Sequence, residues 1–163
     1  MRYRICKSFE VESGHMLSKH PGRCRLPHGH TRRIDLVLSS ETLDESDMVC
    51  DFKALKLAVA EYLDAFDHAL AVNAHDPEVG ALRSSVLGGR LIEFDGEDPT
   101  TEVMARRIFE HVAGVLARAG RGPGDPAGAF RDELGHAYAL REGVTLERVR
   151  VTETSSSWAE YGR

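Results

Sequence analysis

Alternating apolar and polar positions predict two β-strands within the first forty residues. The first strand covers residues 3–11, and its apolar parity comprises Tyr3, Ile5, Phe9 and Val11. The second covers residues 31–40, and its apolar face comprises Ile34, Leu36 and Leu38. His15 continues the parity of the first strand if that strand extends so far. His28 and His30 continue the parity of the second, unless a turn or bulge near Pro27 breaks the phase.

Apolar residues at helical spacing predict two helices in the middle of the protein. Asp51 can cap the first helix, whose apolar stripe comprises Phe52, Leu55, Val59, Tyr62 and Leu63. Thr100 can cap the second helix, with Pro99 just outside it and Glu102 near the positive end of its dipole. The apolar face of the second helix comprises Met104, Ile108, Val112, Val115 and Leu116.

The remaining segments are shorter or less regular. A loop rich in Ala, Asn, Asp and Gly follows the first helix, and RLIEF within it predicts a short strand. Residues 118–129 form a Gly/Pro-rich break, and the segment that continues to about Gly143 fits either a loop or a short helix. Residues 145–154 and the segment SWAEYG predict two final strands. The order of two strands, two helices and two strands indicates an α+β fold.

Length, charge and cysteine content narrow the class of protein. The 163 residues are enough for a single domain with a substantial core. The formal charge of −5 provides no basic surface for nucleic acid, and no apolar run approaches the roughly 18 residues of a membrane-spanning helix. The first ten residues lack the apolar block of a signal peptide, and the three cysteines form no CxxC pair. These features predict a cytoplasmic protein without a disulfide framework.

The stretch PGRCRLPHGH combines a cysteine with two histidines spaced by one glycine. In a strand, His28 and His30 project from the same face, and His15 adds a third imidazole if the first two strands are antiparallel neighbours. Three histidines around an open position are typical of a catalytic zinc site. A Cys/His metal cluster, a metal site beside a separate thiolate, and a coincidence of loop residues all fit this pattern. His111 and His136 have no cluster around them and are interpreted as structural.

Three other positions combine a chemical and a structural interpretation. Cys24 fits a small buried side chain, a fourth zinc ligand, or a thiolate activated by its arginine neighbours. Asp67 and His68 fit a capping or surface pair, or a proton relay. Glu153 shares the parity of the apolar face of the last long strand. A carboxylate on that face needs a hydrogen-bond or charge partner unless it is exposed to solvent near the strand end. It could accept two N–H groups from the amidine-like edge of a ligand.

Six segments together resemble one superfamily: ESGHML, CRLPHGH, DFKALK, FDHALAVN, PTTEV and VTET. Their combination and order are similar to those of the 6-pyruvoyltetrahydropterin synthases and 6-carboxytetrahydropterin synthases. The resemblance spans most of the sequence. It implies the following site: zinc (Zn²⁺) ligands His15, His28 and His30; catalytic Cys24 with the relay pair Asp67 and His68; a pterin-anchoring carboxylate at Glu153; and a helix start beside the pterin at Thr100 and Thr101.

The resemblance also implies a fold and an assembly. The expected fold is the tunnelling fold, a four-stranded antiparallel sheet with two helices on one face in the order ββααββ. A single domain over residues 1–163 is expected, with an insertion at about residues 118–143. Three subunits are expected to join their sheets into a barrel and two such rings to stack into a homohexamer. The sites then lie between subunits, with the Asp–His pair supplied by a neighbour.

The spacing of Cys24 and His28 indicates the branch of the superfamily. Three residues separate them, as in the bacterial 6-carboxytetrahydropterin synthases, whereas the animal pyruvoyl-forming enzymes have a longer gap. The implied function is a zinc-dependent lyase that converts 7,8-dihydroneopterin triphosphate to 6-carboxy-5,6,7,8-tetrahydropterin, with release of acetaldehyde and triphosphate, for queuosine biosynthesis. The alternatives are a 6-pyruvoyltetrahydropterin synthase, a non-catalytic pterin-binding module and a structural zinc protein. Five cations near the site are candidates for the triphosphate, and none is assigned: Lys19, Arg23, Arg25, Arg32 and Arg33.

Overall fold

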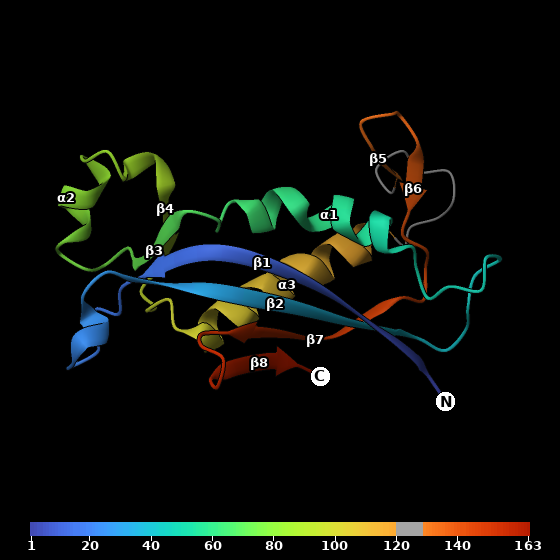
Figure 1. The fold of residues 1–163 in the computed structure, drawn as a ribbon, viewed down its shortest axis with the longest axis horizontal. Coiled ribbons are helices and arrows are strands. Elements are labelled where there is room, and N and C mark those ends of the chain that lie inside the picture. Colours follow the sequence, from blue (N-terminus) through green and yellow to red (C-terminus); the bar gives the residue numbers. More distant parts are fainter. Residues whose placement is uncertain (120–128) are drawn as a thin grey trace.

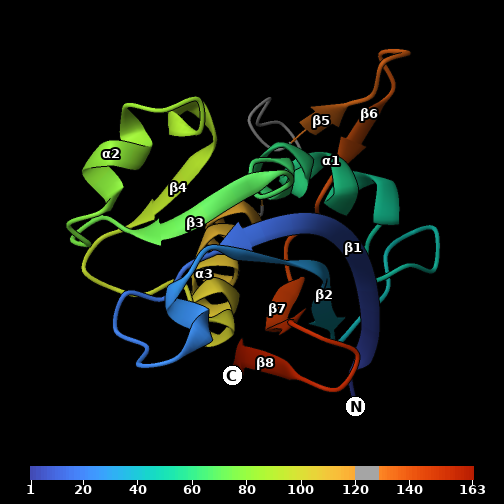
Figure 2. The same ribbon diagram turned by 60° about the vertical axis from the view of Figure 1, so that its left-hand side comes forward.

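A six-stranded mixed sheet forms the centre of the computed structural model, which describes residues 1–119 and 129–163 (Figure 1). The strand order across the sheet is β4-β3-β1-β2-β7-β8. The strands are β1 (Tyr3–His15), β2 (His28–Ser40), β3 (Ala69–Asn73), β4 (Leu91–Phe94), β7 (Thr145–Thr152) and β8 (Trp158–Gly162). Figure 2 shows how strongly the sheet curls, with α3 (Thr101–Ala119) running along one face.

The α+β class is confirmed, but the prediction of a four-stranded antiparallel sheet in ββααββ order is wrong. Strands β1, β2, β7 and β8 are antiparallel neighbours, as expected. Strands β3 and β4 extend this sheet beyond β1 in the parallel sense. The predicted short strand RLIEF is β4. Strand β3 was missed because its five residues, ALAVN, are almost all buried and therefore show no alternation.

Both predicted helices form, and both begin at the predicted caps. Helix α1 (Phe52–Asp64) starts after Asp51, whose carboxylate accepts the N–H of Lys53 at 2.6 Å. The hydroxyl of Thr100 accepts the N–H of Val103 at the start of α3. One prediction within α1 is wrong, because Phe52 is 47% exposed and lies outside the buried stripe.

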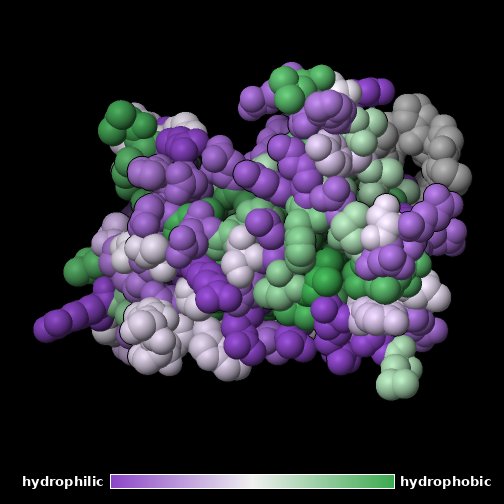
Figure 3. Space-filling model, turned by 45° about the vertical axis from the view of Figure 1, so that its right-hand side comes forward, coloured by the Kyte–Doolittle hydropathy of each residue, from purple (hydrophilic) through white to green (hydrophobic). Residues whose placement is uncertain are grey.

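The apolar faces of the two helices pack on one face of the sheet and form the main core. Its central sheet residues come from one parity of β2 and β7: Ile34, Leu36, Leu38, Val149 and Val151. The helices contribute Leu55, Val59, Leu63, Met104, Ile108 and Val112. Figure 3 shows apolar side chains gathered in a hollow across the middle of the face in view, with polar side chains bordering it.

A second, two-stranded sheet follows α3. It is the hairpin of β5 (Ala129–Arg131) and β6 (Ala137–Ala139), which projects away from the main sheet (Figure 1). The segment leading to Gly143, expected to be a loop or a short helix, therefore contains a hairpin. Residues 120–128 of the insertion predicted at about 118–143 lie outside the described residues.

Two connections between neighbouring strands contain short helical segments. Helix α2 (Val79–Arg83) and the 3-10 turn η2 (Gly88–Arg90) lie between β3 and β4, and the 3-10 turn η1 (Arg23–Arg25) lies between β1 and β2. Among residues 1–119 and 129–163, no helix combines the length and hydrophobicity needed to span a membrane.

A candidate metal centre at one end of the sheet

The antiparallel register of β1 and β2 brings the three predicted ligand histidines together. His15, the last residue of β1, lies directly opposite His28, the first residue of β2. Strand β2 begins three residues before the predicted start, so His28 and His30 project from the same face, as predicted. Ile34 and Leu36 share this parity and are fully buried, which means that the histidines continue the row of core side chains.

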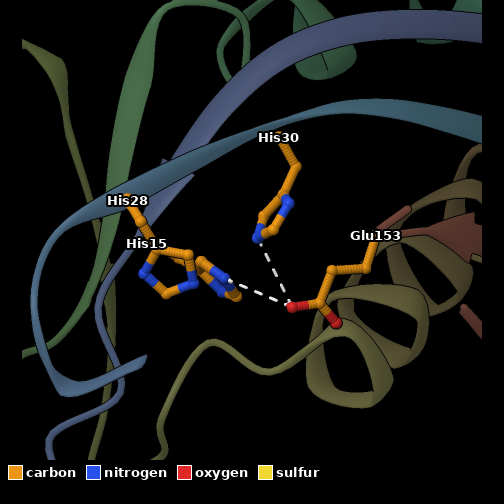
Figure 4. A group of neighbouring side chains, drawn as sticks. All are labelled: His15, His28, His30 and Glu153. Carbon is orange, nitrogen blue, oxygen red and sulfur yellow. Dashed lines mark ion pairs between the residues drawn. The ribbon is translucent and has the colours of Figure 1, made fainter. Parts of the chain in front are cut away.

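The three imidazoles and the carboxylate of Glu153 converge on one point (Figure 4). The ring centroids are 4.4 Å apart for His15 and His28, 5.2 Å for His15 and His30, and 5.1 Å for His28 and His30. Glu153 Oε1 lies 3.7 Å from His15 Nε2 and 3.4 Å from His30 Nε2. Each of the four residues offers one ligand atom, and these atoms all lie within 4.8 Å of one another.

Backbone carbonyls orient two of the imidazoles. His15 Nδ1 lies 2.9 Å from the carbonyl oxygen of Pro99, and His28 Nδ1 lies 2.8 Å from that of Leu26. A carbonyl can only accept, so each Nδ1 carries the proton and each Nε2 keeps its lone pair. This is the outer-shell arrangement that holds metal-binding histidines in the required tautomer.

The fourth donor completes a site that fits a metal ion. His30 Nε2 is buried and has no hydrogen-bond partner among the described residues. Bonds of about 2.0–2.2 Å to a tetrahedral zinc ion would place neighbouring ligand atoms roughly 3.3–3.6 Å apart. The separations of 3.4 and 3.7 Å between Glu153 Oε1 and two imidazole nitrogens are close to this range. Three imidazoles and one carboxylate therefore fit a metal ion such as zinc.

Burial keeps the imidazoles in the form that binds metal. The pKa of His15 is lowered from 6.5 to about 4, mainly by burial and also by the nearby charges of Arg32 and His28, against the opposing effect of the Pro99 carbonyl. Burial and Arg32 also lower the pKa of His30. Both side chains are therefore neutral at pH 7, as metal coordination requires.

The depressed pKa of His15 predicts a loss of stability in mild acid. In the metal-free protein, the unfolded polypeptide takes up a proton at His15 as the pH falls through 6.5, whereas the folded protein resists protonation down to about 4. The stabilisation is therefore complete above pH 6.5 and falls by about 3 kcal/mol as the pH approaches 4. Urea denaturation of the metal-free protein at pH 7, 6, 5 and 4.5 is expected to show a decrease, and an NMR titration of the His15 ring should give a midpoint near 4. A His15 midpoint near 6.5 would contradict this assignment.

Glu153 is held by a short series of buried polar groups. Its Oε2 accepts the hydroxyl proton of Thr101 at 2.9 Å, and Arg32 donates to the same hydroxyl oxygen at 3.1 Å. Burial alone would raise the pKa of Glu153, but the Thr101 hydrogen bond and the charges of Arg32 and the histidines outweigh it and lower the pKa. The carboxylate predicted to lie on the apolar face thus has partners there. Arg32, one of the five candidate triphosphate cations, is only 1% exposed and therefore does not face solvent.

A buried aspartate that the sequence did not single out connects three segments around the centre. Asp98 accepts the hydroxyl of Ser18 at 2.5 Å, the N–H of Lys19 at 2.7 Å and the amide of Asn73 at 3.1 Å. It thereby joins the segment after β1 and the end of β3 to Pro99, whose carbonyl orients His15. The available signal was a carboxylate immediately before a proline at a helix start, which is typical of a local turn.

Cys24 lies in η1, outside the group of potential metal ligands. It is half-buried, and its carbonyl accepts the N–H of Leu17 at 2.9 Å, which fixes the η1 turn beside the residues that follow β1. Among the described residues, the potential metal-binding group contains no cysteine. The arrangement therefore favours a metal site with a separate thiol over a Cys/His cluster.

Asp67 and His68 form a hydrogen-bonded pair at the start of β3, also outside the ligand group. His68 Nδ1 lies 2.7 Å from Asp67 Oδ2, and Asp67 Oδ1 accepts the backbone N–H of Glu12 at 2.7 Å. The Glu12 amide and then His68 lower the pKa of Asp67. The His68 side chain is 72% exposed and borders a cavity of about 310 Å³ that His30 also lines. Asp67 thus fixes the orientation of the His68 ring, and the imidazole is open to solvent.

Two of the other histidines and three of the cations named from the sequence have local partners. His111 stacks on Tyr62 with ring centroids 3.6 Å apart, and His136 lies 3.2 Å from the Asp132 carboxylate. Lys19 Nζ donates to the carbonyl of Gly96, and Arg25 donates to that of Ser18. Arg33 pairs with Asp35. None of these contacts identifies a triphosphate site.

Comparison with known proteins gives consistent matches. A family model described as 6-pyruvoyl tetrahydropterin synthase matches residues 4–124. The protein is 35% identical to 6-carboxy-5,6,7,8-tetrahydropterin synthase of Haemophilus influenzae over 98% of each sequence. It is 26% identical to the protein of the same name from Aquifex aeolicus, over 99% of this sequence and 98% of that one. The 6-pyruvoyl tetrahydropterin synthase structure from Caenorhabditis elegans shares its fold, with a TM-score of 0.61, 19% identity and coverage of 100% of this protein and 96% of that one.

Proposed function

Because this chain belongs to the 6-pyruvoyl tetrahydropterin synthase family, we propose that it is a lyase with 6-carboxytetrahydropterin synthase activity. Its reaction is the conversion of 7,8-dihydroneopterin triphosphate to 6-carboxy-5,6,7,8-tetrahydropterin, with release of acetaldehyde and triphosphate, in a cytoplasmic route to 7-deazaguanines such as queuosine. The observation that carries the proposal is the convergence of His15, His28, His30 and Glu153 in a protein whose full-length relatives bear that name.

The proposed cofactor is zinc, held by His15, His28 and His30. The neutral Nε2 atoms, the carbonyl bonds at Nδ1 and the unpartnered His30 Nε2 support this ligand set. When bound, the metal supplies Lewis-acid polarisation of the hydroxyl groups on the pterin side chain. The Pro99 and Leu26 carbonyls keep the two imidazoles in the orientation that this binding needs.

The proposed roles of the other residues follow from their chemistry. Cys24, as the thiolate, removes a carbon-bound proton from the substrate side chain, which is the difficult step. His68, oriented by Asp67, returns or relays protons while a carbon–carbon bond of that side chain is cleaved in retro-aldol fashion. Glu153 accepts the N–H groups of the 2-amino-4-oxo edge of the pterin, beside Thr101 and Thr100 at the start of α3.

Glu153 must move to perform this role. With Oε1 3.4 Å from His30 Nε2, its carboxylate lies against the histidines and leaves no room for a bicyclic ring between them. The side chain is 31% exposed and follows the last residue of β7, so rotation about its side-chain bonds needs no change in the sheet. We therefore infer that Oε1 turns away from the imidazoles when the pterin enters, while Oε2 keeps its hydrogen bond to the Thr101 hydroxyl.

Assembly into trimers, or a dimer of trimers, is part of the proposal. Among the described residues, the outer edges of β4 and β8 have no strand partner, so each can pair with another copy. The sheet face opposite the helices carries ion pairs such as Arg4–Glu147 and Arg150–Glu160, which suits the lining of a polar tunnel. A second copy could then bring its Asp67–His68 pair to the site of the first.

The second candidate is 6-pyruvoyltetrahydropterin synthesis at the same site. It is favoured by the description of the matching family and by the fold shared with the Caenorhabditis elegans enzyme. The three-residue gap between Cys24 and His28 favours the carboxy-forming branch instead. A non-catalytic pterin-binding module would need Glu153 but neither the thiol nor the Asp67–His68 pair.

Product analysis separates these candidates. The zinc-loaded protein is expected to release one acetaldehyde for each 7,8-dihydroneopterin triphosphate consumed, because cleavage of a carbon–carbon bond in the substrate side chain is what leaves a 6-carboxy group. A coupled alcohol dehydrogenase assay measures acetaldehyde, and mass spectrometry identifies the pterin. Accumulation of the 6-pyruvoyl product without acetaldehyde would establish the second candidate. Binding without turnover would indicate a pterin-binding module.

A further inference from the structure

Arg32 places a buried positive charge beside a site that fits a cation. Its side chain is 1% exposed, and its Nη2 lies 3.3 Å from both ring nitrogens of His15. Like charges this close repel strongly in a buried environment, so the guanidinium weakens metal binding rather than supporting it. Because Arg32 is buried, it is not available to bind a triphosphate from solution.

The contact with His15 does not explain why Arg32 is buried there. His15 Nδ1 donates its proton to the Pro99 carbonyl, and the lone pair of Nε2 is the one that a metal ion uses. A guanidinium has no acceptor and can only donate, so its bond to Nε2 competes with the metal. The acceptors that stay available to Arg32 Nη1 when a metal is bound are Thr101 Oγ1 at 3.1 Å and the Thr152 carbonyl at 3.4 Å.

The donor and the acceptor of each of these hydrogen bonds are fixed. Since Arg32 must donate, the Thr101 oxygen accepts, and the single hydroxyl proton is left for another acceptor. That acceptor is Glu153 Oε2, 2.9 Å away. Thr101 is 4% exposed and lies in the first turn of α3, so its hydroxyl has a fixed position. The result is a linear hydrogen-bond relay, in which Arg32 donates to Thr101 and Thr101 donates to the Glu153 carboxylate.

We propose that Arg32 is a positioning residue that acts through Thr101 to hold the Glu153 carboxylate in place for the pterin edge, and so determines pterin affinity. The inference rests on the proposed role of Glu153. It differs from a structural role, in which Arg32 only anchors the end of β7 through the Thr152 carbonyl. A structural role affects stability, whereas a positioning role affects pterin binding specifically.

The test compares Arg32→Met, Arg32→Lys and the matched control Arg33→Met. Met replaces the unbranched stem of the Arg side chain without its charge and donors, and Arg33 is the exposed neighbour on the opposite face of β2. For the zinc-loaded protein, Arg32→Met is expected to weaken neopterin binding, followed by ligand fluorescence, about tenfold. It should raise KM for 7,8-dihydroneopterin triphosphate by a similar factor, with kcat changed less than threefold. Arg32→Lys, which keeps the charge and one donating nitrogen, should recover part of the affinity, and Arg33→Met should bind neopterin like the wild type.

A double-mutant cycle with Thr101→Val distinguishes action through Thr101 from an independent effect. Val removes the hydroxyl at nearly constant volume, so Thr101→Val alone should also weaken neopterin binding about tenfold. Adding Arg32→Met to Thr101→Val should then cost less than threefold more, because the relay is already broken. Zinc content is expected to stay at one per subunit, with equal or higher zinc affinity in Arg32→Met. If Arg32→Met does not fold, Thr101→Val and Arg32→Lys still test the relay.

Three outcomes would overturn the inference: unchanged neopterin affinity in Arg32→Met, effects of Arg32→Met and Thr101→Val that multiply, or loss of zinc with normal neopterin affinity. Failure of the proposed function looks different, because the wild-type protein itself would then not bind neopterin.

Discussion

Replacing Cys24 by alanine is expected to lower kcat for acetaldehyde release by about 10²–10⁴-fold, the usual contribution of a general acid–base residue. The reason is that no other thiol is available to remove the carbon-bound proton: Cys50 is 3% exposed, in the core, and Cys6 lies at the far end of β1 from the histidines. Zinc content should stay at one per subunit, since Cys24 is not part of the ligand group. Neopterin affinity should change little, because the carboxylate that binds the pterin edge is untouched.

The matched control is Cys6→Ala, which removes an exposed thiol from the same protein. Its kcat, zinc content and oligomeric state are expected to equal those of the wild type. The rate of acetaldehyde release and the zinc content by elemental analysis are measured for the wild type, Cys24→Ala and Cys6→Ala. Full turnover by Cys24→Ala would remove the thiol from the mechanism and leave the Asp67–His68 pair as the base.

Residue parity along the strands predicted most of the centre. His15, His28 and His30 fall on the parities of Val11 and Ile34, both buried, and the antiparallel pairing of the two strands then brings the imidazoles within reach of one ion. The helix caps at Asp51 and Thr100 were readable for a similar reason, since capping depends on residues close in sequence. Where the determinants are local or periodic, the amino-acid sequence was sufficient.

The order of strands in the sheet was not readable, because pairing is decided by contacts between distant residues. Strand β3 pairs with β1 in parallel and with β4 on its other side, and its buried ALAVN run gives no periodic signal of either. The β5–β6 hairpin was missed for a related reason, since strands of three residues are too short to show alternation.

Arg32 illustrates a different limit. Its position in the strand places it on the core face with Ile34. A charged side chain on that apolar face is unfavourable unless hydrogen-bond acceptors surround it, and the sequence does not show such acceptors. Those acceptors, Thr101 and the Thr152 carbonyl, are 69 and 120 residues away in the sequence. The roles of Cys24 and the Asp67–His68 pair are also hard to predict from the sequence. The structure gives their local partners, but the substrate on which they would act together is a separate molecule.

Replacing His28 by alanine is the most direct test of the metal centre. His28 is half-buried and its Nδ1 bonds only the neighbouring Leu26 carbonyl, so its removal disturbs the fold less than removal of the fully buried His15. Loss of an outer-shell partner typically weakens metal binding 10–100-fold, so loss of a ligand should weaken it more than about 100-fold. Elemental analysis after dialysis should find less than one zinc per subunit, with acetaldehyde release lost in parallel.

The control for His28→Ala is His20→Ala, which removes an exposed imidazole from the same connection between β1 and β2. Its zinc content and activity are expected to be unchanged. Residual zinc in His28→Ala is informative as well, because His15, His30 and Glu153 still offer three donors. If Glu153 supplies one of them, adding Glu153→Gln to His28→Ala should remove the residual zinc. Wild-type zinc affinity in His28→Ala would show that the metal, if any, binds elsewhere, and the chemistry proposed for this end of the sheet would have to be abandoned.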